Sequence, residues 1–143
     1  MTDVHSLSVE RVVPGAINDV FDAWLNPTQL SRWMTPGPSM SVPVAEVDPR
    51  VGGRFYIVMR SSGRDIPHEG EYRVIDRPSR LVFTWNSEPA GRDTLVTVTF
   101  VKVAERETRV QLTHERFANA ASRDSHRNGW GVILDAMAEA FRG

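Results

Sequence analysis

Apolar and polar residues alternate along most of the chain, which is the pattern of strands buried on one face. In the segment TRVQLTHERF, Val110, Leu112 and His114 share one face of the predicted strand, and polar residues occupy the other. The same alternation recurs in LSVERVV, RFYIVMR, HEGEYRVID, RLVFTW and DTLVTVTFVKVA, each bounded by Gly, Pro, Asp, Asn or Ser. The pattern predicts a meander of antiparallel strands with one apolar and one largely solvated face.

Two short segments after the first predicted strand follow a helical period instead. From Ile17 to Leu25 apolar residues recur every three or four positions, with Asn18 and Asp19 on the opposite side. A second helix is predicted to start at Pro27, because Asn26 can cap it and proline is tolerated in the first turn. The proline-rich segment 35–43 that follows is expected to form a loop or a poorly paired edge strand.

The segment HRNGWGVILDAMAEAF, residues 126–141, is the one long amphipathic helix that the pattern predicts. Its apolar stripe consists of Trp130, Ile133, Leu134, Met137 and Phe141. Because the strands leave one apolar face uncovered, this stripe is expected to cover the sheet, which predicts an α+β domain. Gly129 and Gly131 flank Trp130 and are expected to let neighbouring backbone or side chains approach the helix closely.

The composition narrows the classes of function. The chain has 143 residues and a net charge of -1, so it is expected to form one domain over residues 1–143 with no basic field for nucleic acid. It contains no cysteine, which excludes disulfides, thiol nucleophiles and thiolate metal sites. No histidine or carboxylate cluster has metal-site spacing and no phosphate-binding glycine loop occurs, so neither metal nor cofactor is expected. Without a signal segment or membrane span, a cytoplasmic location is expected.

Three polar side chains fall on predicted strand faces that carry apolar residues. His114 follows Val110 and Leu112 on one strand, while His68 and Tyr72 share a face with Val74 on another. Such groups can orient a ligand carbonyl or hydroxyl, or exchange a proton with it. A single histidine on an apolar face is more often a hydrogen-bonded core group. The alternation of side chains between the two faces of a strand, here called strand parity, does not show whether the three side chains converge.

Four stretches, taken together, resemble one protein family. They are LSVERVVPGAINDVFDAWLNPTQLSRWMTPGP, DPRVGGRF, GEYRVIDRPSRLVFTW, and THERF followed by HRNGWGVILDAMAEAF. Their order resembles the family named after the activator of the heat-shock-protein-90 ATPase, a branch of the SRPBCC (START-like, birch-pollen-allergen-like) superfamily. One departure is that Pro14, Gly15 and Ala16 stand where the family usually has Ala-Pro. The resemblance implies a helix-grip fold, a curved antiparallel sheet around a long C-terminal helix, with a cavity between them.

The resemblance also implies that the cavity binds a small hydrophobic molecule, such as a lipid, a polyketide or an aromatic compound. The residues expected to contact it are Trp33, Phe55, Ile57, Met59, His68, Tyr72, Phe83, Trp85, Leu112, His114, Trp130, Leu134 and Met137. Two alternatives stay open: a protein-interaction module of the co-chaperone kind, and a cofactor-free cyclase or dehydratase that uses His or Tyr. A homodimer is compatible with the sequence, but no apolar stripe requires one.

Overall fold

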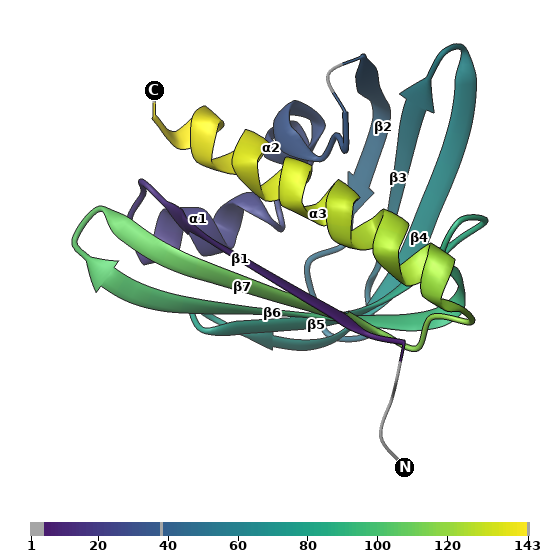
Figure 1. The fold of residues 1–143 in the computed structure, drawn as a ribbon. Helices are drawn as coiled ribbons and strands as arrows, with labels where there is room; N and C mark the ends of the chain where they lie inside the picture. The colour runs from purple at the N-terminus through teal and green to yellow at the C-terminus, as the bar shows by residue number, and fades with distance from the viewer. Residues whose placement is uncertain (1–4, 38, 143) are drawn as a thin grey trace.

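In the computed structural model, which describes residues 5–37 and 39–142, the chain forms a curled sheet and three helices (Figure 1). The helices are α1 (Ile17–Ala23), α2 (Pro27–Trp33) and α3 (Ala120–Phe141). The strands are β1 (Leu7–Val13), β2 (Met40–Val47), β3 (Arg54–Ser61), β4 (Arg64–Asp76), β5 (Arg80–Ser87), β6 (Gly91–Ala104) and β7 (Glu107–Glu115). This is the predicted α+β helix-grip architecture, with two short helices after the first strand and one long helix at the end.

Neighbouring strands are antiparallel throughout the sheet, whose order is β1-β7-β6-β5-β4-β3-β2. β1 and β2 are therefore the two edge strands. In Figure 1 the sheet curls around α3, so that β2 to β4 stand beside the helix while β5 to β7 pass beneath it. α1 and α2 lie on the same concave side. The predicted cover of the apolar face by the last helix is thus confirmed.

Both short helices begin where the sequence places them. The Asn26 side chain accepts a hydrogen bond from the backbone N–H of Gln29 at 3.1 Å and caps α2. α1 starts at Ile17 in spite of the unusual residues before it. Gly15 suits this point, because a Cβ atom there would lie 2.6 Å from Cδ1 of Phe141 and would force its ring to shift. A glycine therefore lets the end of α3 pack against the start of α1.

The long helix starts earlier than the sequence predicts, at Ala120 rather than at His126. The Asn119 side chain caps it by accepting a hydrogen bond from the backbone N–H of Ser122 at 2.8 Å. The residues 119–125 carry no apolar stripe, so hydrophobic periodicity gives no sign of these first turns.

Strand parity holds along β7, where Val110, Leu112 and His114 are buried as predicted. It fails in β4, because a β-bulge lies between Tyr72 and Val74. The extra residue turns Val74 away from the face of His68 and Tyr72, so the prediction that all three share a face was wrong for Val74. Ile75 takes the inward position instead and packs against the core.

The outer face of the sheet is less solvated at its centre than the alternation predicts. Val82 and Thr84 of β5 point away from the concave side, yet their exposed fractions are only 8% and 6%. β5 is the middle strand of the sheet, so it has neighbours on both sides. The Thr84 hydroxyl also accepts a hydrogen bond from the backbone N–H of Glu71 at 2.9 Å. Edge strand β2 is irregular around Pro43, as the proline-rich sequence predicts.

Candidate functional site

A cavity of about 160 Å³ lies between the first half of α3 and the part of the sheet formed by β2 to β5. Most of its lining is apolar, and its polar side chains are Ser125, His68 and His126. The lining residues are Pro36, Met40, Met59, Ile66, His68, Trp85, Pro89, Ser125, His126, Gly129, Trp130 and Ile133. No Asp, Glu, Lys or Arg is among them, so the cavity presents no fixed charge to a ligand.

The lining runs from the surface of the protein into its core. Pro89 and Ser125 are exposed, whereas His68, Trp85 and Trp130 are buried. The exposed part of the lining therefore comes from the β5–β6 turn and the first turns of α3. The hydroxyl of Ser122 joins these two segments by donating to the carbonyl of Pro89 at 2.6 Å.

The two glycines beside Trp130 face neighbouring groups on two sides of α3. A Cβ atom on Gly129 would lie 3.4 Å from Cβ of Pro36, in the loop after α2. A Cβ atom on Gly131 would lie 3.3 Å from Nη2 of Arg11, on edge strand β1. The first distance is an ordinary contact, and the second is only slightly tight and involves the flexible end of an arginine, so neither position requires a glycine. The expected role of the two glycines in close approach is therefore not supported, although Gly129 and Pro36 both line the cavity.

His114 belongs to a hydrogen-bond chain behind the cavity and does not line it. The indole N–H of Trp130 donates to Nδ1 of His114 at 2.9 Å, so the ring proton of the neutral imidazole is on Nε2. Nε2 then donates to the Thr94 hydroxyl at 2.8 Å, and this hydroxyl donates to the carbonyl of Trp85. Burial, aided by the nearby His126, lowers the pKa of His114 to about 2. His114 therefore orients Trp130 and has no nitrogen left for a ligand.

His68 lines the cavity from β4 and lies beside Trp85, with the two ring centroids 5.0 Å apart. Its side chain is buried, and Nδ1 has no hydrogen-bond partner among the described residues. Burial lowers the pKa of His68 to about 4, against an opposing effect of the Ile57 and Ile66 carbonyls. This histidine is neutral at pH 7.

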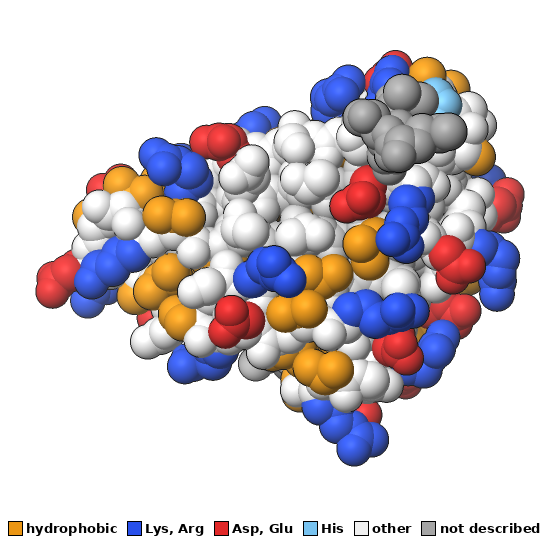
Figure 2. Space-filling model, turned by 90° about the horizontal axis from the view of Figure 1, so that it is seen from below, with side chains coloured by type: hydrophobic (Ala, Val, Ile, Leu, Met, Phe, Trp, Pro, Cys, Tyr) orange, Lys and Arg blue, Asp and Glu red, His pale blue; other side chains and the backbone are white. Residues whose placement is uncertain are grey.

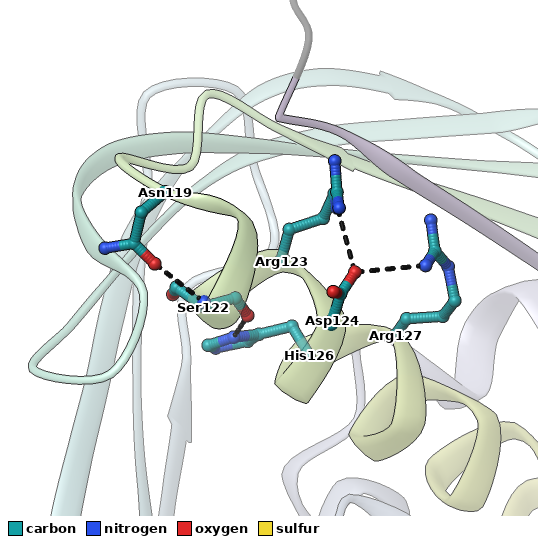
Figure 3. A network of polar contacts seen from close by, with 6 residues as sticks. All are labelled: Asn119, Ser122, Arg123, Asp124, His126 and Arg127. Atoms are coloured by element: carbon teal, nitrogen blue, oxygen red, sulfur yellow. Dashed lines mark hydrogen bonds and ion pairs between the residues drawn. The ribbon is translucent and has the colours of Figure 1, made fainter.

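His126 lines the cavity from α3, one helical turn before Trp130. Its Nδ1 donates to the carbonyl of Ser122 at 2.8 Å (Figure 3). Burial lowers the pKa of His126, and the hydrogen bond to Ser122 opposes this shift. The charged side chains of Asp124 and Arg127 lie on the other side of the helix in Figure 3, away from the His126 ring.

Tyr72 is not near the two cavity histidines but in a separate inner hollow. This hollow is lined by Trp24, Leu30, Met34, Phe55, Ile57, Tyr72, Phe83 and Trp85, and its volume is about 10 Å³. A space of roughly this size holds at most one water molecule, so the hollow is packed core. Burial raises the pKa of Tyr72, which therefore stays protonated. The structure does not bring His68, Tyr72 and His114 together.

The residues expected to contact a ligand thus divide into three groups. Four line the cavity, namely Met59, His68, Trp85 and Trp130. Trp85 also borders the inner hollow, together with Phe55, Ile57, Tyr72 and Phe83. Five are buried and line neither space: Trp33, Leu112, His114, Leu134 and Met137. Strand parity separates inward from outward residues but cannot tell a cavity wall from solid core.

His126 is the functional candidate that the sequence interpretation missed. It lies four residues before Trp130 and therefore on the same face of a helix, which is the signal that could have identified it. The loop residues Pro36 and Pro89 give no comparable signal, because nothing in a periodic pattern predicts where a loop folds back.

The arrangement offers two neutral imidazoles, on His68 and His126, in one mostly apolar cavity. A neutral imidazole can accept a hydrogen bond or a proton from a bound molecule. Within residues 5–37 and 39–142, no three His, Asp or Glu side chains form a group that could hold a metal ion. In the same part of the chain, no helix has the length and apolar character needed to cross a membrane.

Comparison with known proteins agrees with this fold. The model of the family described as "Activator of Hsp90 ATPase homolog 1-like protein" matches residues 15–142. No curated protein matches the sequence.

Solved structures resemble the chain over nearly its whole length. An X-ray structure of a Chromobacterium violaceum protein has a TM-score of 0.87 and 22% identity, and covers 97% of this chain and 98% of that one. A Nitrosomonas europaea protein has a TM-score of 0.81 and 24% identity, with 99% and 97% covered. An Hsp90 activator from Plasmodium falciparum has a TM-score of 0.73 and 25% identity, with 94% of both chains covered.

Proposed function

Because the chain belongs to the family of activator of Hsp90 ATPase homolog 1-like proteins, we propose that it binds a small hydrophobic molecule in the cavity between the sheet and α3. The observation that carries the proposal is the chemical character of this cavity, whose walls include Trp85 and Trp130 and whose lining holds no charged residue. Small-molecule sites are typically apolar pockets with a few polar groups. An engineered apolar cavity of about 150 Å³ binds benzene, so this one is large enough for a small ring compound.

Toluene is a suitable first probe, because it has one apolar ring and no hydrogen-bonding group. We expect toluene to shift the NMR signal of the Trp130 indole N–H and to raise the melting temperature. Ile133→Phe should fill the cavity and abolish both effects, since Ile133 lines it. Val132→Phe is the matched control, because Val132 directly precedes Ile133 in α3 and does not line the cavity. Toluene binding that survives Ile133→Phe would place the ligand elsewhere.

Native mass spectrometry of the protein purified without added ligand gives an independent test. A discrete bound mass in the wild type that is lost in the Ile133→Phe variant supports the proposal and identifies the chemical class. An empty protein that also takes up neither toluene nor a panel of lipids and aromatic ketones contradicts it.

A protein-interaction function is the second candidate, and the likeness to the Plasmodium falciparum Hsp90 activator supports it. The outer surface supports it less. On the face drawn in Figure 2, apolar side chains occur in small groups between charged ones, whereas protein-binding surfaces usually have a larger continuous apolar patch. Stimulation of Hsp90 ATP hydrolysis that is equal for the wild type and the Ile133→Phe variant would favour this alternative over the cavity.

A further inference from the structure

The cavity lining restricts the charge of its ligand. The titratable side chains in it are His68 and His126, and both have pKa values lowered by burial. An ionised carboxylate or ammonium group would lose its hydration in the cavity without meeting an opposite charge, which is strongly unfavourable. A ligand buried here is therefore uncharged.

The hydrogen bonds around His126 fix the role of its second ring nitrogen. Since Nδ1 donates to the carbonyl of Ser122, the neutral ring has its proton on Nδ1, and Nε2 is an acceptor. Within the described part of the chain, Nε2 has no hydrogen-bond partner, and it is not fully buried. An incoming group can therefore reach it.

Ser122 itself is held in place from both sides (Figure 3). Its backbone N–H is bound by the Asn119 side chain at 2.8 Å, and its hydroxyl donates to the Pro89 carbonyl at 2.6 Å. The carbonyl that orients His126 is therefore part of a fixed turn. A preorganised acceptor of this kind binds a donor with little loss of conformational entropy.

We propose, on the basis of the proposed binding function, that the cavity selects an uncharged, single-ring aromatic ligand with a hydroxyl or ring N–H group that donates to Nε2 of His126. Trp85 and Trp130 contact the ring, and the donor points toward the first turns of α3, where His126 lies. Phenol is the simplest member of this class. The volume of about 160 Å³ matches a ligand of one ring rather than a long-chain lipid.

Phenol, toluene and benzoate test this selectivity, because they share the ring and differ in the donor and the charge. In the wild type at neutral pH we expect phenol to bind about tenfold more tightly than toluene, the effect of one additional hydrogen bond, and benzoate to bind more weakly than either. In His126→Phe the affinity for phenol should fall to that for toluene. Nitrogen NMR should show the His126 Nε2 signal shifting with phenol and not with toluene.

The possible results separate the two proposals. Equal affinities for phenol and toluene in the wild type, or tighter binding of benzoate, overturn the selectivity and leave the binding function in place. A phenol preference without a shift of the Nε2 signal overturns the role of His126, even where His126→Phe is too unstable to compare. Failure of phenol, toluene and benzoate alike to bind overturns both proposals.

Discussion

His114 and His68 are both buried on the concave side of the sheet, but the two regions around them differ in how the polar atoms are paired. In the region of His114, both ring nitrogens are hydrogen-bonded, to the Trp130 indole and to the Thr94 hydroxyl. In the region of His68, Nδ1 has no partner among the described residues, and neither has the indole nitrogen of the adjacent Trp85. The first region is a closed network, and the second borders a cavity.

The difference shows that burial alone does not identify a binding residue. A buried polar group with every hydrogen bond satisfied stabilises the fold and specifies one packing. A buried polar group with an unused nitrogen beside a cavity is where a ligand or a water molecule can be accommodated. The two histidines are equivalent by strand parity, and only their hydrogen bonds distinguish them.

Lowering the pH should reduce the free energy of unfolding more than any single substitution does, because both histidines are buried in the neutral form. Their folded-state pKa values, about 4 for His68 and about 2 for His114, lie below the usual value of 6.5. The unfolded chain therefore binds protons first, and the free energy of unfolding falls as the pH drops below 6.5. The slope approaches about 1.4 kcal/mol per pH unit for each histidine, several kcal/mol by pH 4.5.

Chemical denaturation at pH values from 7 to 4.5 measures this slope, in a range above the usual pKa of most carboxylates. His68→Leu should make the slope shallower, because one of the buried histidines with a lowered pKa is removed. A wild-type stability that does not change over this range would show that neither histidine is as strongly desolvated as its position indicates.

Substitution by leucine should separate the two histidines at neutral pH. His114→Leu leaves the Trp130 indole N–H buried without an acceptor and deprives Thr94 of its donor, so we expect a loss of about 3 kcal/mol. In His68→Leu no hydrogen bond of Nδ1 is lost, and only the interaction of the ring with the Ile57 and Ile66 carbonyls is removed, so we expect a loss of about 1 kcal/mol. Urea unfolding of both variants measures the difference, and equal losses would contradict the distinction between the two regions.

The sequence predicts the fold well because burial of one face of an element requires a periodic pattern of apolar residues. The strand alternation, the cap at Asn26 and the Trp130 stripe are local signals, and each corresponds to an element of the structure. The β-bulge after Tyr72 and the polar first turns of α3 show no such pattern. They depend on how strands pair and on where a loop meets a helix.

The candidate site is predicted less well, for a related reason. Phe83 and Trp85 lie on the same face of one strand, yet Trp85 borders the cavity and Phe83 only the inner hollow. Which side chains leave space between them depends on the curvature of the whole sheet. Pro36 and Pro89 reach the cavity from loops, and periodic patterns do not place loops.

Two tryptophans give the finest comparison of the two regions, since each can be changed to phenylalanine. Trp130→Phe removes the donor to Nδ1 of His114, which leaves a buried acceptor unpaired, and we expect a loss of about 2 kcal/mol in the free energy of unfolding. Trp85→Phe removes an indole N–H that has no partner within the described residues, so the loss should be about 1 kcal/mol and arise from packing.

Urea unfolding measures both losses, and nitrogen NMR of His114 reports the hydrogen bond directly. In Trp130→Phe the Nδ1 signal should shift, and in Trp85→Phe it should stay where it is in the wild type. A larger loss for Trp85→Phe, or an unchanged Nδ1 signal in Trp130→Phe, would mean that the indole of Trp130 is held by packing and not by His114.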